Sequence, residues 1–198
     1  DVAKAKTTPP AHRLLIQGLP ADENQLAGFR EHAGRMLRSS RRVSLLADFL
    51  AQRYGLQNAL REWVAKVPVA YATMLMGKGL FDEQQSGFVG TYSGIASAEE
   101  TRDAIENADT IICIGTRFTD TITAGFTQHL PLEKTIEIQP FAVRVADRWF
   151  SRIPMEKALA ILIELSASLA AEWVSPNIQA PGVSGAPEGN LYSKTCMN

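Results

Sequence analysis

The feature that most constrains the fold is an apolar, β-branched run at residues 67–75, VPVAYATML, which leads directly into a glycine-rich segment. A buried strand that ends in such a segment is typical of the carboxyl edge of an α/β sheet, where these folds place ligands and partner surfaces. We therefore expect residues 77–94 to form a loop that faces other parts of the protein. Its distinctive residues are Gly77, Lys78, Gly79, Gly87, Gly90 and Gly94.

Helical and strand patterns alternate along the rest of the chain. Asp22 is predicted to cap a first helix with Gln25 as its capping-box partner, and Ser97 to open a capping box for a later helix. A helix from about Gly55 and a last helix that begins at Pro154 complete the helical set. The predicted strands are VSLLADF, residues 67–75, TIICIG, TIEI and residues 142–145. This alternation predicts an α/β fold of three layers, with a parallel sheet of five or six strands and helices on both faces.

The same patterns divide the chain into three regions. Residues 1–21 are expected to be a linker from an upstream domain, and residues 22–172 the α/β domain. Residues 173–198 are rich in Pro, Gly and Ser, which predicts a disordered linker.

Composition excludes several classes of function. The chain has 198 residues with 45% hydrophobic residues, 21% charged residues and a net charge of −1, so nothing indicates binding to nucleic acid or to an anionic membrane. No apolar run approaches the roughly 20 residues of a membrane span, and the first ten residues lack a signal core, which favours the cytoplasm. Two cysteines without metal-ligand spacing, Cys113 and Cys196, predict neither a metal site nor a disulfide framework.

The segment Met76-Gly77-Lys78-Gly79 invites comparison with a phosphate-binding loop. Such a loop needs a glycine five residues before the Gly-Lys pair, where this chain has Ala72, and Ser or Thr after the lysine, where it has Gly79. A tight turn with a surface lysine is therefore favoured over a nucleotide site.

A second candidate site is the exit of the TIICIG strand, at Gly115, Thr116 and Arg117. It has only the first glycine of a dinucleotide fingerprint. These residues could meet a phosphate, but a loop that packs on a neighbour is favoured. Neither the three histidines nor the paired carboxylates form a recognisable catalytic arrangement, so no catalytic residue is predicted.

Longer segments resemble a known family. ATMLMGKGLFDEQQSGFVGTYSG, NADTIICIGTRFTDTITAGF, DRWFSRIPM and LLADFLAQRYGLQNALREWV are similar to the central, Rossmann-like domain of thiamine-diphosphate-dependent 2-oxo-acid decarboxylases. The resemblance is closest to bacterial indolepyruvate or phenylpyruvate decarboxylase, near pyruvate decarboxylase. It covers roughly residues 41–170, in order and without large gaps.

The resemblance implies a parent enzyme of three domains. One flanking domain would bind the aminopyrimidine, and the other would bind the diphosphate and Mg²⁺ through a Gly-Asp-Gly motif that this sequence does not contain. This chain would then be a central domain with no cofactor of its own and no activity alone, and the two flanking domains would be its partners. The parent would be a homo-oligomeric lyase that converts an aromatic 2-oxo acid to an aldehyde.

Other interpretations remain open at this point. A free-standing FAD or NAD binder would place Gly115, Thr116 and Arg117 on a diphosphate, and a pure interaction module would use an exposed apolar patch. Residues 187–198 leave the family's linker pattern, which a truncation, a frameshift or appended residues would each explain.

Overall fold

A computed structural model describes residues 20–174 together with the isolated positions 4, 6 and 8. The expected linkers at residues 1–21 and 173–198 therefore lie almost entirely outside the described residues. Every helix and strand given below lies within residues 20–174. No helix of this part of the chain has the length and apolar character that a membrane crossing requires.

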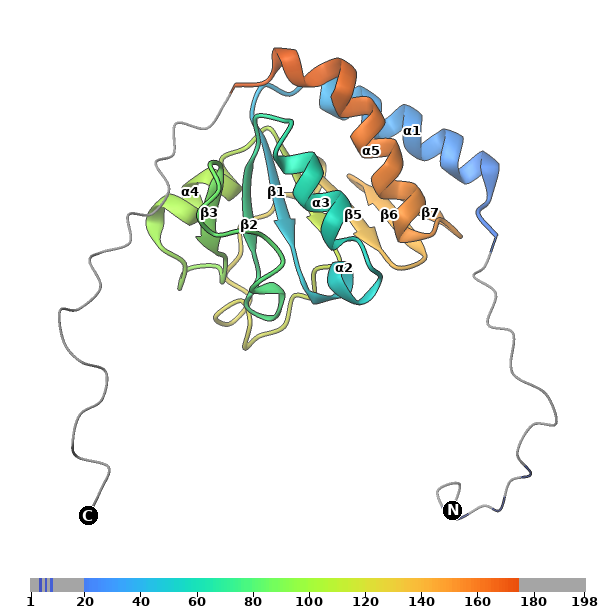
Figure 1. Cartoon of the computed structure of the whole chain (residues 1–198), viewed down its shortest axis with the longest axis horizontal. Coiled ribbons are helices and arrows are strands. Elements are labelled where there is room, and N and C mark those ends of the chain that lie inside the picture. Colours follow the sequence, from blue (N-terminus) through green and yellow to red (C-terminus); the bar gives the residue numbers. More distant parts are fainter. Residues whose placement is uncertain (1–3, 5, 7, 9–19, 175–198) are drawn as a thin grey trace.

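Five α-helices and seven strands make up the described fold (Figure 1). The helices are α1 (Glu23–Arg38), α2 (Phe49–Arg53), α3 (Gln57–Val64), α4 (Glu99–Glu106) and α5 (Met155–Leu169). The strands are β1 (Val43–Ala47), β2 (Ala70–Thr73), β3 (Phe88–Thr91), β4 (Thr110–Ile114), β5 (Thr135–Gln139), β6 (Ala142–Val145) and β7 (Arg148–Ser151). Short 3-10 helices occur at η2 (Leu75–Gly77), η3 (Leu132–Lys134) and η4 (Ala170–Glu172).

The strands form one sheet in the order β3-β2-β1-β4-β5-β6-β7. The five strands from β3 to β5 are parallel, which confirms the predicted parallel α/β sheet. β6 and β7 extend it to seven strands and are antiparallel to their neighbours. Two-residue connections join β5 to β6 and β6 to β7, and such short turns can join only antiparallel strands.

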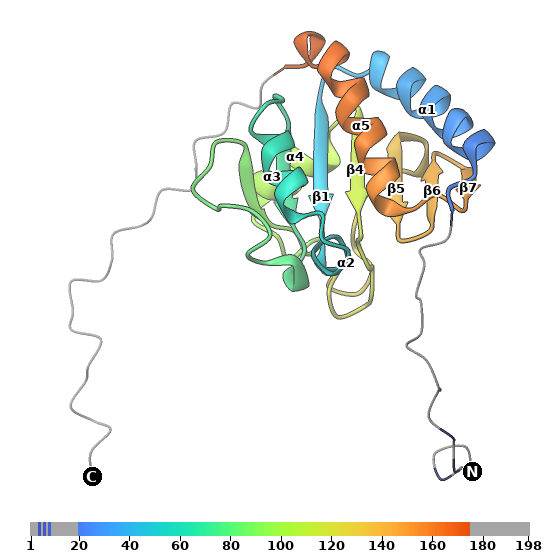
Figure 2. The same cartoon turned by 45° about the vertical axis from the view of Figure 1, so that its right-hand side comes forward.

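Alternating side chains of the strands supply the two sides of the core. Leu45 and Ile112 face the layer that contains α1, α3 and α5, whereas Leu46 and Ile111 face α4. Helices therefore cover both faces, as predicted: α4 lies on the face opposite α1, α3 and α5, and it packs mainly against β1, β2 and β3 (Figure 2). On the α4 side the β5–β7 part of the sheet carries polar and aromatic side chains instead, including Arg144 and the exposed Trp149.

The helices begin close to where the sequence predicted, but the predicted capping boxes do not form. Asp22 caps α1 and accepts hydrogen bonds from the amides of Asn24 and Gln25, but the Gln25 side chain accepts a hydrogen bond from the Ser151 amide instead of completing a capping box. The capping box predicted at Ser97 is wrong. Ala98 occupies the N-cap position of α4 and makes no side-chain cap, because the Ser97 hydroxyl accepts a hydrogen bond from the Ser93 amide.

The glycine-rich segment is more structured than the sequence predicted. The strand expected at residues 67–75 is shortened to β2, and Leu75 begins the 3-10 turn η2. Residues 77–94 are not one loop, because they contain β3, which runs from the opposite edge of the sheet back to the carboxyl edge. Gly77 and Gly94 therefore lie at the carboxyl edge, whereas Gly90 lies inside β3.

Candidate functional site

The carboxyl ends of β1, β2, β3 and β4 meet at one edge of the sheet, which lies at the bottom of Figures 1 and 2. The two sequence candidates both belong to this edge. Gly77 follows β2, and Gly115 follows β4 on the other side of the central strand β1. The chain order reverses between β1 and β4, which is where α/β sheets open a crevice for ligands.

Gly115 closes this crevice by direct backbone contact with α2. It has a φ of +63°, and a Cβ placed on it would lie 2.5 Å from the Ala51 nitrogen and 2.9 Å from the Leu50 Cβ. A glycine is required here for both reasons, because a side chain would be strained and would push α2 away. The space that a dinucleotide would occupy next to Gly115 is therefore filled by the chain's own helix.

Thr116 and Arg117 lie in different environments. Thr116 is buried, its carbonyl accepts a hydrogen bond of 2.9 Å from the Gln139 side chain, and its hydroxyl has no hydrogen-bond partner among the described residues. Arg117 is exposed. The structure thus brings these two residues to the edge without directing their side chains to one common point.

Lys78 behaves as the predicted surface lysine. Its ammonium lies 3.5 Å from the Glu83 carboxylate, and both side chains are largely exposed. Gly79 has a φ of +88° with open space around it, so it serves the turn and not a close contact.

Gly90 and Gly94 support packing of neighbouring segments. A Cβ on Gly90 would lie 2.9 Å from the Thr101 hydroxyl, and that hydroxyl donates a hydrogen bond to the Val89 carbonyl. Gly94 contacts the Thr127 hydroxyl so closely that no side chain fits, and the same hydroxyl accepts a hydrogen bond of 2.9 Å from the Ile95 amide. The loops after β3 and β4 are therefore fixed to each other.

Sequence reasoning missed Asp48, the first residue after β1. It is fully buried, and neither of its carboxylate oxygens has a hydrogen-bond partner among the described residues. Burial raises the pKa of Asp48, and the backbone amides of Phe49, Arg117 and Gly77 face the carboxylate and oppose that rise. An aspartate directly after a buried strand at this edge was the available signal, since the neighbouring residues VSLLA are all apolar or small.

Exposed apolar side chains also gather on this edge, in the loops that follow β2, β3 and β4. Ile95 is 65% exposed and Phe126 59% exposed. Phe126 and Ala124 both adopt positive φ angles, and the Phe126 amide donates to the Thr123 hydroxyl, so the local turn holds Phe126 outward. The carboxyl-edge apolar surface consists of Leu75, Met76, Ile95 and Phe126.

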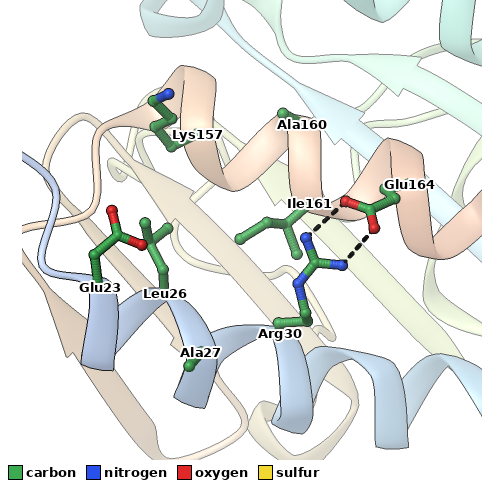
Figure 3. A pocket seen from close by; sticks show the side chains of 8 residues that line it. All are labelled: Glu23, Leu26, Ala27, Arg30, Lys157, Ala160, Ile161 and Glu164. Atoms are coloured by element: carbon green, nitrogen blue, oxygen red, sulfur yellow. Dashed lines mark hydrogen bonds and ion pairs between the residues drawn. The ribbon is translucent and has the colours of Figure 1, made fainter.

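A pocket of about 390 Å³ lies elsewhere, between α1 and α5 (Figure 3). Arg30 spans it and donates two hydrogen bonds, of 2.8 and 2.6 Å, to the carboxylate of Glu164. This ion pair lowers the pKa of Glu164 and occupies the guanidinium of Arg30, while Glu23 and Lys157 also line the groove. We therefore interpret the pocket as a groove between two packed helices and not as a binding site.

The remaining reactive groups do not gather into a catalytic or metal site. Within residues 20–174, no three or more His, Cys, Asp or Glu side chains come together in a way that could hold a metal ion. Burial raises the pKa of the Cys113 thiol to about 12, so this cysteine is an inert core residue.

Comparison with known proteins agrees with this geometry. Residues 30–164, more than half of the chain, match the family described as "Thiamine pyrophosphate enzyme, central domain". An α-keto-acid decarboxylase of Mycobacterium leprae is 32% identical over 195 residues, which cover 98% of this chain and 33% of that protein. An α-keto-acid decarboxylase of Mycobacterium tuberculosis is 35% identical over 162 residues, which cover 82% of this chain and 29% of that protein.

The fold has a counterpart among solved structures. A protein of Mycobacterium smegmatis, described as a "putative thiamin diphosphate-dependent enzyme", has an X-ray structure that superposes with a TM-score of 0.52 at 20% identity over 88% of this chain and 32% of that one. The chain spans about a third of the length of the relatives that it matches. On the strength of the match over residues 30–164, this chain belongs to the central-domain family of thiamine pyrophosphate enzymes.

Proposed function

We propose that this chain is the non-catalytic central domain of a thiamine-diphosphate- and Mg²⁺-dependent lyase that decarboxylates an aromatic 2-oxo acid such as indolepyruvate. The names of the mycobacterial relatives support the decarboxylase activity. The aromatic substrate is supported by the resemblance of residues 72–94, 107–126 and 147–155 to indolepyruvate decarboxylases. A cytoplasmic, homo-oligomeric parent enzyme is part of the same proposal.

The observation that carries the scaffolding role is the carboxyl-edge apolar surface. The loops that begin at Gly77, Gly94 and Gly115 present it, and close contacts hold them in place: Gly77 against β1, Gly94 against Thr127, and Gly115 against α2. A rigid apolar surface with no catalytic group beside it suits a permanent contact with another domain. In this proposal its partners are the pyrimidine-binding and diphosphate-binding domains.

The described residues do not fit the thiamine cofactor. The carboxylate of Asp48 is sealed from solvent, so it offers no ligand to an Mg²⁺–diphosphate group arriving at the edge. The proposal therefore assigns the cofactor to the other two domains, and no chemical step passes through a residue of this chain.

Two assays test this function. The purified chain, supplied with thiamine diphosphate, Mg²⁺ and indolepyruvate, is expected to release no aldehyde and no CO₂. Grafted into the Mycobacterium tuberculosis decarboxylase in place of the 162 matched residues, it is expected to support 2-oxo-acid decarboxylation. Release of product by the chain alone would refute the non-catalytic role.

A matched pair of variants in the same chimera tests the scaffolding surface. Replacing Ile95 and Phe126 together by Ser is expected to lower the activity and the melting temperature of the chimera. Trp149→Ser removes a side chain of similar exposure, 56%, from the far end of the sheet, and it is expected to leave the activity of the chimera unchanged. Equal loss in both variants would count against a specific role for the carboxyl edge.

A further inference from the structure

Asp48 poses a problem that the proposed function does not explain. Its side chain is fully buried, yet both carboxylate oxygens lack a hydrogen-bond partner among the described residues. Native proteins leave few buried polar groups unpaired, because each one forfeits its hydration without compensation. A carboxyl group kept in such a place needs a reason beyond filling the core.

Its surroundings resemble an anion cradle. The amides that face the carboxylate come from three separate segments: Phe49 after β1, Gly77 after β2 and Arg117 after β4. The backbone at Gly77 comes so close that a Cβ there would lie 2.8 Å from the Asp48 Cα and 3.2 Å from Oδ1. Convergent backbone amides of this kind form concavities that bind oxyanions.

The cradle is not matched to a tethered carboxylate. The three amides face the group, but none completes a hydrogen bond to either oxygen, and the Gly77 amide donates to the Met74 carbonyl at 3.0 Å. The position of the oxygens is thus set by the short Asp side chain and not by the donors. A free oxyanion in the same place could move to meet them.

The location is the one where a sheet of this topology binds ligands. The cradle lies outside the carboxyl end of β1, between its neighbours β2 and β4 and next to the point where the strand order reverses. Two more buried hydroxyls without partners, those of Thr73 and Thr116, lie at the ends of these neighbouring strands. The edge therefore keeps hydrogen-bonding capacity that the chain itself does not use.

We propose that this edge is an oxyanion-binding site that the chain fills from within, with the Asp48 carboxylate standing where the phosphate or carboxylate of a ligand would bind. The contact of Gly115 with α2 closes the site over it. In this arrangement the Asp48 carboxylate occupies the space between the ends of β1, β2 and β4, and it keeps free anions out of the crevice.

The test is to remove the carboxylate and offer a free anion instead. The variant Asp48→Ala is melted in tens of millimolar sodium formate or sodium phosphate, with sodium chloride at equal ionic strength as the reference. A ligand that binds only the folded state raises the melting temperature. At an anion concentration well above the dissociation constant, we expect the melting temperature of this variant to be about 2–4 °C higher than in chloride. The unaltered chain is expected to show no rise, because its site is full.

Two controls keep the outcome decisive. Asp48→Asn fills the same space without the charge and is expected to show no rise with either anion. If Asp48→Ala does not fold in chloride, formate or phosphate is expected to restore its circular dichroism and its cooperative melt. A folded Asp48→Ala that responds to neither anion, or an unfolded one that neither anion restores, overturns the proposal.

Discussion

The ion pair between Glu137 and Arg144 allows a test of how strongly burial affects the contribution of a charged contact to the free energy of unfolding. The two residues face each other across β5 and β6, with Arg144 Nη2 2.5 Å and Nε 3.1 Å from Glu137 Oε2. Their side chains are only 15% and 18% exposed. Glu137→Gln leaves the guanidinium largely desolvated without its counter-charge, and we expect a loss of about 2 kcal/mol in the free energy of unfolding, measured in urea at neutral pH.

Glu164→Gln is the matched control for that variant. Glu164 accepts equally short hydrogen bonds from Arg30, but the side chains of this pair are 66% and 43% exposed, so water can replace the lost partner. We expect its urea midpoint to stay close to that of the unaltered chain. A loss as large as that of Glu137→Gln would show that geometry, and not burial, determines the energy.

Individual residues also mark the limit of sequence reasoning. The turn at Lys78 was predictable, because it depends on its own neighbours in the chain. Asp48 was not, since its burial comes from segments near Gly77 and Arg117 that only the folded sheet brings together. The place of Asp48 after a buried strand is visible in the sequence, but the convergence of these separate segments around it is not.

Among the elements, α2 depends most on a single distant residue. It has only five residues and docks against Gly115, where a Cβ would lie 2.5 Å from the Ala51 nitrogen. Gly115→Ala adds backbone strain at a φ of +63° to this overlap, and we expect a loss of about 3 kcal/mol or more in the free energy of unfolding. Chemical unfolding followed by circular dichroism measures it.

Gly55→Ala separates the two causes. Gly55 has a similar φ of +74°, but nothing lies within 4 Å of the position a Cβ would take. We expect this variant to lose only about 1 kcal/mol, the cost of the left-handed conformation. Equal losses in the two glycine variants would mean that α2 can shift away from Gly115 at little cost.

Elements with a clear apolar pattern in the sequence were predictable, and those that depend on tertiary contacts were not. β4 is five consecutive buried residues, and its apolar sequence announced it. β3 was hidden, because it contains Gly90 at a φ of +115°; the absence of a side chain permits this conformation and also the close approach of Thr101. The capping box predicted at Ser97 does not form for a similar reason, because the Ser97 hydroxyl accepts a hydrogen bond from the Ser93 amide instead.

At the scale of the whole molecule, the carboxyl edge of the sheet is notable for its exposed apolar side chains. The carboxyl edge presents Leu75, Met76, Ile95 and Phe126, each more than half exposed, on loops that mutual contacts hold rigid. The relatives are about three times as long as this chain, so most of the polypeptide that could cover such an edge is not part of it. Within the described residues, this edge therefore carries four of the large apolar side chains that are more than half exposed.

The isolated chain is accordingly expected to self-associate through this edge. Sedimentation velocity at increasing protein concentration should show a reversible shift from monomer to dimer, because burial of exposed apolar side chains drives association. The double variant with Ser at positions 95 and 126 should remain monomeric over the same range, while Trp149→Ser should associate like the unaltered chain. A monomer at every concentration would remove the main support for an interdomain contact here, and association that persists in the double variant would place the contact elsewhere on the molecule.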